Sequence, residues 1–130
     1  MINAPAAILA TLQAAPAVTN LTTTARIWAE HNEPPKGYAI ADGPCITFKT
    51  RGGGADYSDV LLEPSVQVLC IAATVADTHE LYRAIYDALQ NAHNGTIKWV
   101  RNETLGQTIS MQGTGWPANL SYWRFCIANA

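Results

Sequence analysis

Two different spacings of apolar residues follow one another in the middle of the chain. From Val66 to Ala72 nearly every position after Gln67 is apolar, which is typical of a central strand covered on both faces. From Thr78 to Ala92 the apolar residues recur every three or four positions, which predicts an amphipathic helix. Its apolar stripe is Leu81, Ala84, Ile85, Ala88, Leu89 and Ala92. The pair Asp77 and Glu80 predicts a capping box at its start.

Weaker patterns predict the other elements. Ala4 to Ala15 is predicted to be a helix, with Asn3 as its N-cap and Pro16 marking its end. Further strands are predicted at Ala25–Glu30, Cys45–Thr50, Thr96–Arg101, Leu105–Met111 and Ser121–Ala128. The segment from Asn32 to Pro44 is rich in Pro and Gly and is predicted to be a loop. Together these elements predict an α+β fold: a mixed, largely antiparallel sheet, one main helix across a face and a short N-terminal helix.

Length and charge limit the classes of protein to which the chain can belong. A chain of 130 residues fits one domain, and we expect it to span residues 1–130. Only 14% of the residues are charged, against about 25% in an average chain. The uncharged surface that this implies favours contact with other subunits. The net charge of -2 lacks the basic excess that is typical of a nonspecific DNA or membrane binder.

Charge is distributed unevenly along the chain. The segment from Glu30 to Glu63 is mildly acidic, and the segment that begins at Thr96 is mildly basic. These opposite biases suit subunits that meet head to tail in a ring, but an even scatter of charge is the simpler explanation and the one that we favour.

No motif of catalysis or of cofactor binding stands out. The run Gly52–Gly54 lacks the Gly-Lys-Ser/Thr of a phosphate-binding loop, and no two histidines have the spacing of a helical zinc site. Cys45, Cys70 and Cys126 each lie in a strand-like run and are interpreted as buried small apolar residues. We therefore expect no catalytic, cofactor or metal site, no signal peptide and no membrane span.

Two segments are candidate contact sites. Residues from Arg51 onward form a glycine-rich turn, predicted to be a flexible hairpin tip; its candidate contact residues are Arg51, Gly52, Gly53, Gly54, Asp56 and Tyr57. Trp116 lies in a loop of Gly and Pro, where it either contacts another subunit or caps the core. The other three tryptophans, Trp28, Trp99 and Trp123, are predicted to fill the core against the main helix.

The order of elements resembles the tail terminator (tail completion) proteins of long-tailed bacteriophages. The resemblance covers nearly the whole chain and is carried by the N-terminal helix, the strand at Ala25-Arg26-Ile27 and the Pro34-Pro35 stretch. It is strongest in the unit formed by Val66-Gln67-Val68 and residues Asp77 to Leu89, and the final strand from Tyr122 to Ile127 completes it.

This resemblance implies a non-enzymatic virion protein that forms a hexameric ring. Such a ring caps the tail tube at its head-proximal end, stops tube polymerisation and offers the surface for head–tail joining. The implied partners are further copies of the chain, the tail tube protein and the head–tail connector, with DNA passing through the lumen without specific binding. The loop from Arg51 to Ser58 corresponds to an extended loop that reaches towards neighbouring components in those families.

The implied place of synthesis is the bacterial host cytoplasm. Two alternatives remain: a head–tail connector or neck protein, and a small cytosolic α+β binding module or enzyme. Oligomeric mass separates the assembly proteins from the second alternative, and so does a concave polar pocket in the monomer.

Overall fold

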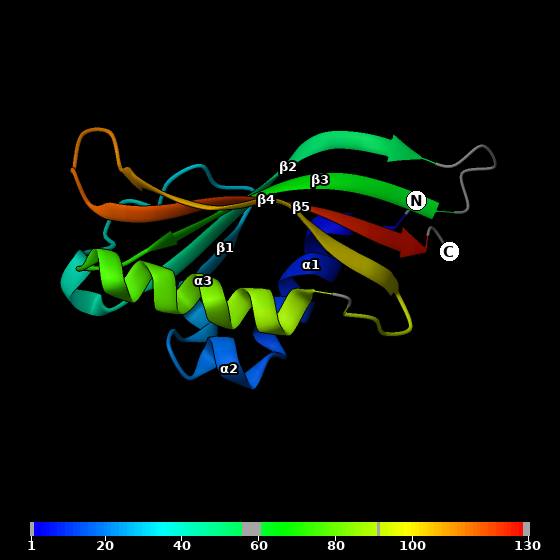
Figure 1. Ribbon diagram of the computed structural model, residues 1–130, viewed down its shortest axis with the longest axis horizontal. Helices are drawn as coiled ribbons and strands as arrows, with labels where there is room; N and C mark the ends of the chain where they lie inside the picture. Colours follow the sequence, from blue (N-terminus) through cyan, green and yellow to red (C-terminus); the bar gives the residue numbers. More distant parts are fainter. Residues whose placement is uncertain (1, 56–60, 91, 129–130) are drawn as a thin grey trace.

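Five strands and three α-helices make up the fold seen in the computed structural model, which describes residues 2–55, 61–90 and 92–128. The helices are α1 (Ala4–Gln13), α2 (Pro16–Thr19) and α3 (Val75–Leu89). The strands are β1 (Ile27–Ala29), β2 (Cys45–Ala55), β3 (Leu61–Ile71), β4 (Ile97–Ser110) and β5 (Pro117–Ala128). All three helices lie on one side of the sheet (Figure 1). The predicted α+β class is therefore confirmed.

The sheet has the strand order β1-β2-β3-β5-β4, so β3 is its central strand, as its apolar sequence predicted. Only β1 and β2 are parallel, with Ile27 opposite Ile46; the other neighbours are antiparallel. Between β3 and β5 the register is regular, from Leu61 opposite Ala128 to Ile71 opposite Ala118. This unbroken pair of long strands forms the centre of the sheet.

The two edges of the sheet are irregular. At one edge, β4 shows three register shifts against β5 between Ile97 and Gln107. At the other edge, β1 ends after three residues, and Glu30 follows with a positive φ of 60°. The Glu30 carboxylate then accepts a hydrogen bond of 2.9 Å from the backbone N–H of Thr50. The Glu30 side chain thus bonds a backbone N–H of β2 that a longer β1 strand would otherwise have paired with.

Helix α3 begins earlier than the sequence predicted. Its N-cap is Thr74, whose hydroxyl accepts a hydrogen bond of 3.2 Å from the Asp77 N–H. Asp77 therefore lies in the first turn, where its carboxylate interacts favourably with the positive end of the helix dipole. The predicted Asp77–Glu80 capping box is wrong, because Thr74 is the N-cap. The helix ends at Leu89 rather than Ala92. At the N-terminus, Asn3 caps α1 as predicted, although α1 ends at Gln13 rather than Ala15.

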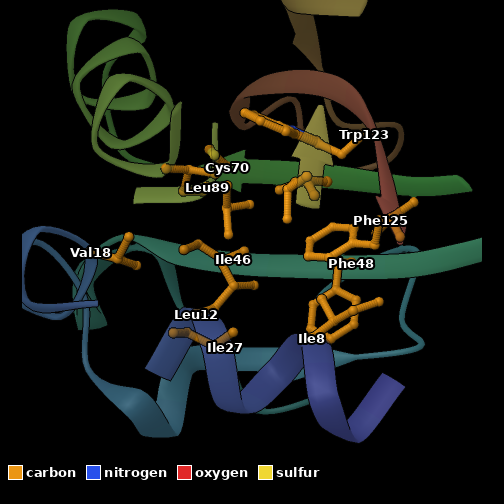
Figure 2. Packing of buried hydrophobic residues seen from close by; sticks show 14 of the residues in the cluster. Ile8, Leu12, Val18, Ile27, Ile46, Phe48, Cys70, Leu89, Trp123 and Phe125 are labelled. Carbon is orange, nitrogen blue, oxygen red and sulfur yellow. The ribbon is translucent and has the colours of Figure 1, made fainter. Parts of the chain in front are cut away.

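The main core lies between the helices and the sheet. Leu81, Ile85 and Leu89 of α3 are almost completely buried there, as the spacing of the apolar stripe predicted. Figure 2 shows Ile8 and Leu12 of α1 pointing towards Phe48 and Ile46 of β2. The inward residues of β5 also follow the predicted alternation: Trp123, Phe125 and Ile127 are fully buried.

A second, smaller core covers part of the opposite face of the sheet. Cys45, Leu69, Ile71 and Ala118 are buried in it. Side chains from β1, from the loop before β2 and from the turn between β4 and β5 pack over them: Trp28, Tyr38, Ile40, Met111 and Trp116 are among these. The central strand is therefore covered on both faces at this end of the sheet.

Two of the three strand tryptophans do not fill the core beneath the helix. Trp123 does, but Trp28 lies on the opposite face, where its ring contacts Tyr38 edge-on at 5.6 Å. Trp99 is half-buried and carries the Arg101 guanidinium over its ring. The prediction failed because a strand residue faces one side or the other according to register, which composition does not reveal.

Strand boundaries also differ from the prediction. The segments predicted as Thr96–Arg101 and Leu105–Met111 are one continuous strand, β4, which absorbs the residues between them as bulges. Residues predicted as part of the first strand, Ala25 and Arg26, form a short 3₁₀ turn instead. Strand β5 begins at Pro117, four residues earlier than expected.

Candidate functional site

The glycine-rich segment is part of a strand rather than a hairpin tip. Arg51, Gly52, Gly53 and Gly54 belong to β2, and Gly53 and Gly54 lie opposite Pro64 and Glu63 of β3. A bulge between Thr50 and Gly53 shifts the register by one residue. The prediction of a flexible tip at these four residues is therefore wrong. The other two candidate contact residues, Asp56 and Tyr57, lie outside the described residues.

Gly53 is required by the geometry of this bulge. Its φ of +124° is one that residues with a side chain rarely adopt. A Cβ atom there would also meet the backbone of β3, with the Pro64 Cα only 2.7 Å away. Gly54, the next residue, has nothing within 4 Å of the corresponding position. The backbone conformation therefore requires glycine at position 53, but it does not require glycine at position 54.

Gly53→Ala is expected to destabilise the protein by about 1–3 kcal/mol. The substitution adds backbone strain, and its methyl group cannot avoid the backbone of β3. Urea unfolding followed by circular dichroism measures the change. Gly54→Ala is the matched control and is expected to alter stability far less. Equal losses in the two variants would show that the bulge does not depend on Gly53.

A polar surface occupies the sheet face opposite α3, beyond the second core. Val66 and Val68 point towards the main core, so Ser65 and Gln67 point to the other side. The same alternation brings side chains from β2, β4 and β5 to this side. We call this surface the open sheet face; it comprises Lys49, Arg51, Glu63, Ser65, Gln67, Trp99, Arg101, Glu103, Tyr122 and Arg124. No described segment lies over this half of the sheet (Figure 1).

The side chains of the open sheet face hold one another in place. The Arg51 guanidinium lies 4.6 Å from the centre of the Tyr122 ring, and that of Arg101 lies 4.7 Å from the centre of the Trp99 ring. Glu103 accepts a hydrogen bond of 2.9 Å from the Ser65 hydroxyl and forms an ion pair of 3.2 Å with Arg124. These contacts link all four long strands across the surface.

Trp116 is half-buried and caps the second core, which was one of its two predicted roles. Its ring contacts Tyr38 edge-on at 5.5 Å, and Tyr38 in turn contacts Trp28. A hollow of about 240 Å³ lies beside it. Its walls are the proline-rich loop and the turn between β4 and β5: Glu33, Pro34, Pro35, Lys36, Gly37, Tyr38, Met111, Gln112, Thr114 and Trp116. Trp116 therefore borders this surface hollow, which lies at the opposite end of the sheet from Gly52–Gly54.

Nucleophilic and metal sites place requirements on the cysteines and the candidate metal ligands of the described residues. All three cysteines are buried, and burial raises the pKa of the Cys45 thiol to about 11, so that it stays protonated at neutral pH. Burial also raises the pKa of Cys70. No three His, Cys, Asp or Glu side chains in the described part of the chain lie close enough to hold a metal ion. Within residues 2–55, 61–90 and 92–128, no helix is long and apolar enough to cross a membrane.

The open sheet face is the feature that sequence reasoning missed. Of the residues in this surface, only Arg51 was predicted to be a contact residue. A signal was present in β5, where Tyr122 and Arg124 alternate with the buried Trp123 and Phe125. Alternation predicts that one side of a strand is polar, but which polar residues of other strands join it depends on register and bulges.

Comparison with known proteins identifies the fold but no family. No family model matches this chain, and no curated protein matches it. Fourteen chains of solved structures do match. One of them belongs to a structure described as the virion of a native gene transfer agent (GTA) particle, with a TM-score of 0.69 and 14% sequence identity, covering 98% of this chain and 100% of that chain. The chain therefore shares its whole fold with a protein chain from a gene transfer agent virion.

Proposed function

We propose that this protein is a virion structural protein that acts as a tail terminator. It forms a hexameric ring at the head-proximal end of the tail tube, ends tube polymerisation and provides the surface for head–tail joining. Its partners are other copies of itself, the tail tube protein and the head–tail connector. DNA passes through the lumen of the ring without specific binding.

The observation that carries this proposal is the end-to-end likeness to a chain of a gene transfer agent virion. The likeness spans both chains almost completely, so it does not arise from a shared fragment. The order of elements independently resembles tail terminators. The fold alone does not fix function, because one fold hosts many roles, but both lines favour assembly over catalysis.

The surface composition is compatible with a ring. The first 25 residues, which contain α1 and α2, carry no Lys, Arg, Asp or Glu. An uncharged helical surface can be buried between subunits without desolvating ions, which is costly when they are unpaired. Heterologous contacts that close on themselves are the usual way in which such surfaces are used in rings.

Light scattering of the purified protein, with negative-stain images of the same sample, tests the proposal. Six-fold rings with a central hole are expected, either from the protein alone or after addition of purified tail tubes. Adding the protein to growing tubes should also stop their elongation. A protein that stays monomeric with and without tubes and leaves elongation unchanged would overturn the proposal. Rings that bind the portal end of heads but not tubes would instead favour a connector or neck protein.

A further inference from the structure

We propose that the open sheet face of one copy binds the solvent-exposed side of α3 in a second copy. This inference rests on the proposed ring and names the surfaces that join its subunits. It concerns the faces of the sheet rather than its edges, because the register shifts of β4 and the short β1 leave irregular edges for strand pairing.

The open sheet face is positively charged in a chain of negative net charge. It carries Lys49, Arg51, Arg101 and Arg124, half of the eight Lys and Arg residues of the chain. Two described carboxylates lie on this face: Glu103, which is paired with Arg124, and Glu63, which alternates with Ser65 and Gln67 along β3, so the four cations still exceed the anions by two. Arg51 and Arg101 are exposed, so their charges are available to a partner.

The exposed side of α3 has the opposite charge. Asp77, Glu80 and Asp87 are exposed there, with Arg83 as the one cation of the helix. These residues lie away from the buried stripe of Leu81, Ile85 and Leu89. A helix face with excess carboxylates is therefore complementary to the basic sheet face.

The two surfaces lie on opposite sides of the molecule, because the sheet and the main core separate them (Figure 1). A contact between them is heterologous, since each copy uses one surface for the copy before it and the other for the copy after it. Such contacts cannot make a closed two-fold dimer, but they close into a ring when the rotation between copies is right. The placement of charge therefore agrees with ring assembly.

Nucleic acid fits the open sheet face less well than a carboxylate-bearing helix. Proteins that bind single strands stack bases on free aromatic rings. Here Arg51 already lies over Tyr122, and Arg101 lies over Trp99. The Glu103 carboxylate, exposed within the same surface, would also repel phosphates.

Charge reversal on each surface separately tests the inference. A sheet variant carries Arg51→Glu and Arg101→Glu, and a helix variant carries Glu80→Lys and Asp87→Lys. Lys36→Glu, an exposed lysine on the proline-rich loop, is the control for a change of net charge. Sedimentation velocity measures assembly of each variant alone and of the two mixed in equal amounts. If the wild type assembles only on tail tubes, the same proteins are compared on tubes. Thermal melting confirms that each variant is folded.

Each reversed variant alone is expected to assemble at least about tenfold more weakly than the wild type, because like charges then face each other at every contact. The equal mixture should regain assembly. In a ring of alternating variants, every reversed sheet face meets a reversed helix, and every native face meets a native helix. An even number of subunits, such as six, allows this alternation. Lys36→Glu should assemble as the wild type does.

Three results would overturn the inference. If rings form and neither reversal weakens them, these surfaces do not join subunits, although the ring itself stands. If only the sheet variant fails and the mixture does not recover, the face binds another partner such as nucleic acid. If the wild type never assembles, with or without tubes, both the inference and the proposed function fail.

Discussion

Trp123→Ala is expected to lower the free energy of unfolding by about 3–5 kcal/mol, the usual range for removing a large buried aromatic side chain. Trp123 is completely buried, and its ring lies edge-on to that of Tyr86 at 5.8 Å. Its indole Nε1–H donates a hydrogen bond of 2.9 Å to the Ser121 hydroxyl, which is itself buried. The substitution therefore leaves a cavity and an unpartnered hydroxyl on the same strand.

Urea unfolding followed by circular dichroism measures this loss. Leu105→Ala is the control, because Leu105 is 69% exposed on the edge strand β4 and its removal opens no cavity. The control is expected to stay within about 0.5 kcal/mol of the wild type. A loss below 1 kcal/mol for Trp123→Ala would mean that β5 does not face α3 in the register described.

Ile85→Ala is expected to destabilise the protein by about 2–5 kcal/mol, because Ile85 lies in the middle of the buried stripe of α3 and is completely buried. Alanine is the better helix former, so the loss measures packing and not helix propensity. The helix meets the sheet through this stripe, and the cavity would open between α3 and the central strands.

Val75→Ala serves as the control on the same helix. Val75 is 45% exposed at the first helical position, so its truncation removes little packing. Thermal melting by differential scanning calorimetry compares the two variants with the wild type. Equal melting temperatures for Ile85→Ala and Val75→Ala would show that the stripe does not bury against the sheet.

Periodic apolar residues allowed correct prediction of the elements that form the core. The stripe of α3 and the alternation of β5 each repeat several times, so one misleading residue does not change the pattern. The start of α3 was misplaced because Thr74 and Asp77 are both residues that cap helices well. Local sequence does not decide between two adequate caps; the end of β3 at Ile71 and the short connection to α3 do.

Glycine misled the prediction in β2. Three consecutive glycines indicate a flexible turn, because glycine loses the most backbone entropy on ordering. In the structure β3 lies beside them, and the pairing of Gly53 and Gly54 with Pro64 and Glu63 keeps them in a strand. The partner that orders this segment is a strand later in the sequence, so a local pattern does not contain it.

Prediction of the candidate site was limited by register in the same way. The residues of the open sheet face come from four strands, and bulges in β2 and β4 determine which of them face outward. One bulge reverses the side of every residue beyond it. Arg101 and Arg124 lie opposite each other across β4 and β5, although they are 23 positions apart and their spacing in the sequence does not reveal the pairing.

The irregular edges of the sheet also affect whether the protein can polymerise through its own strands. A protein that ends a polymer, which is the role proposed above, must not itself serve as a template for endless growth. Regular unpaired edge strands are such templates, because they add strands from other molecules into fibrils. In this chain three register shifts interrupt β4, and the Glu30 carboxylate occupies a backbone donor of β2 just past the short β1. Neither described edge thus offers a long regular ladder to a strand of another molecule, which disfavours amyloid-like stacking.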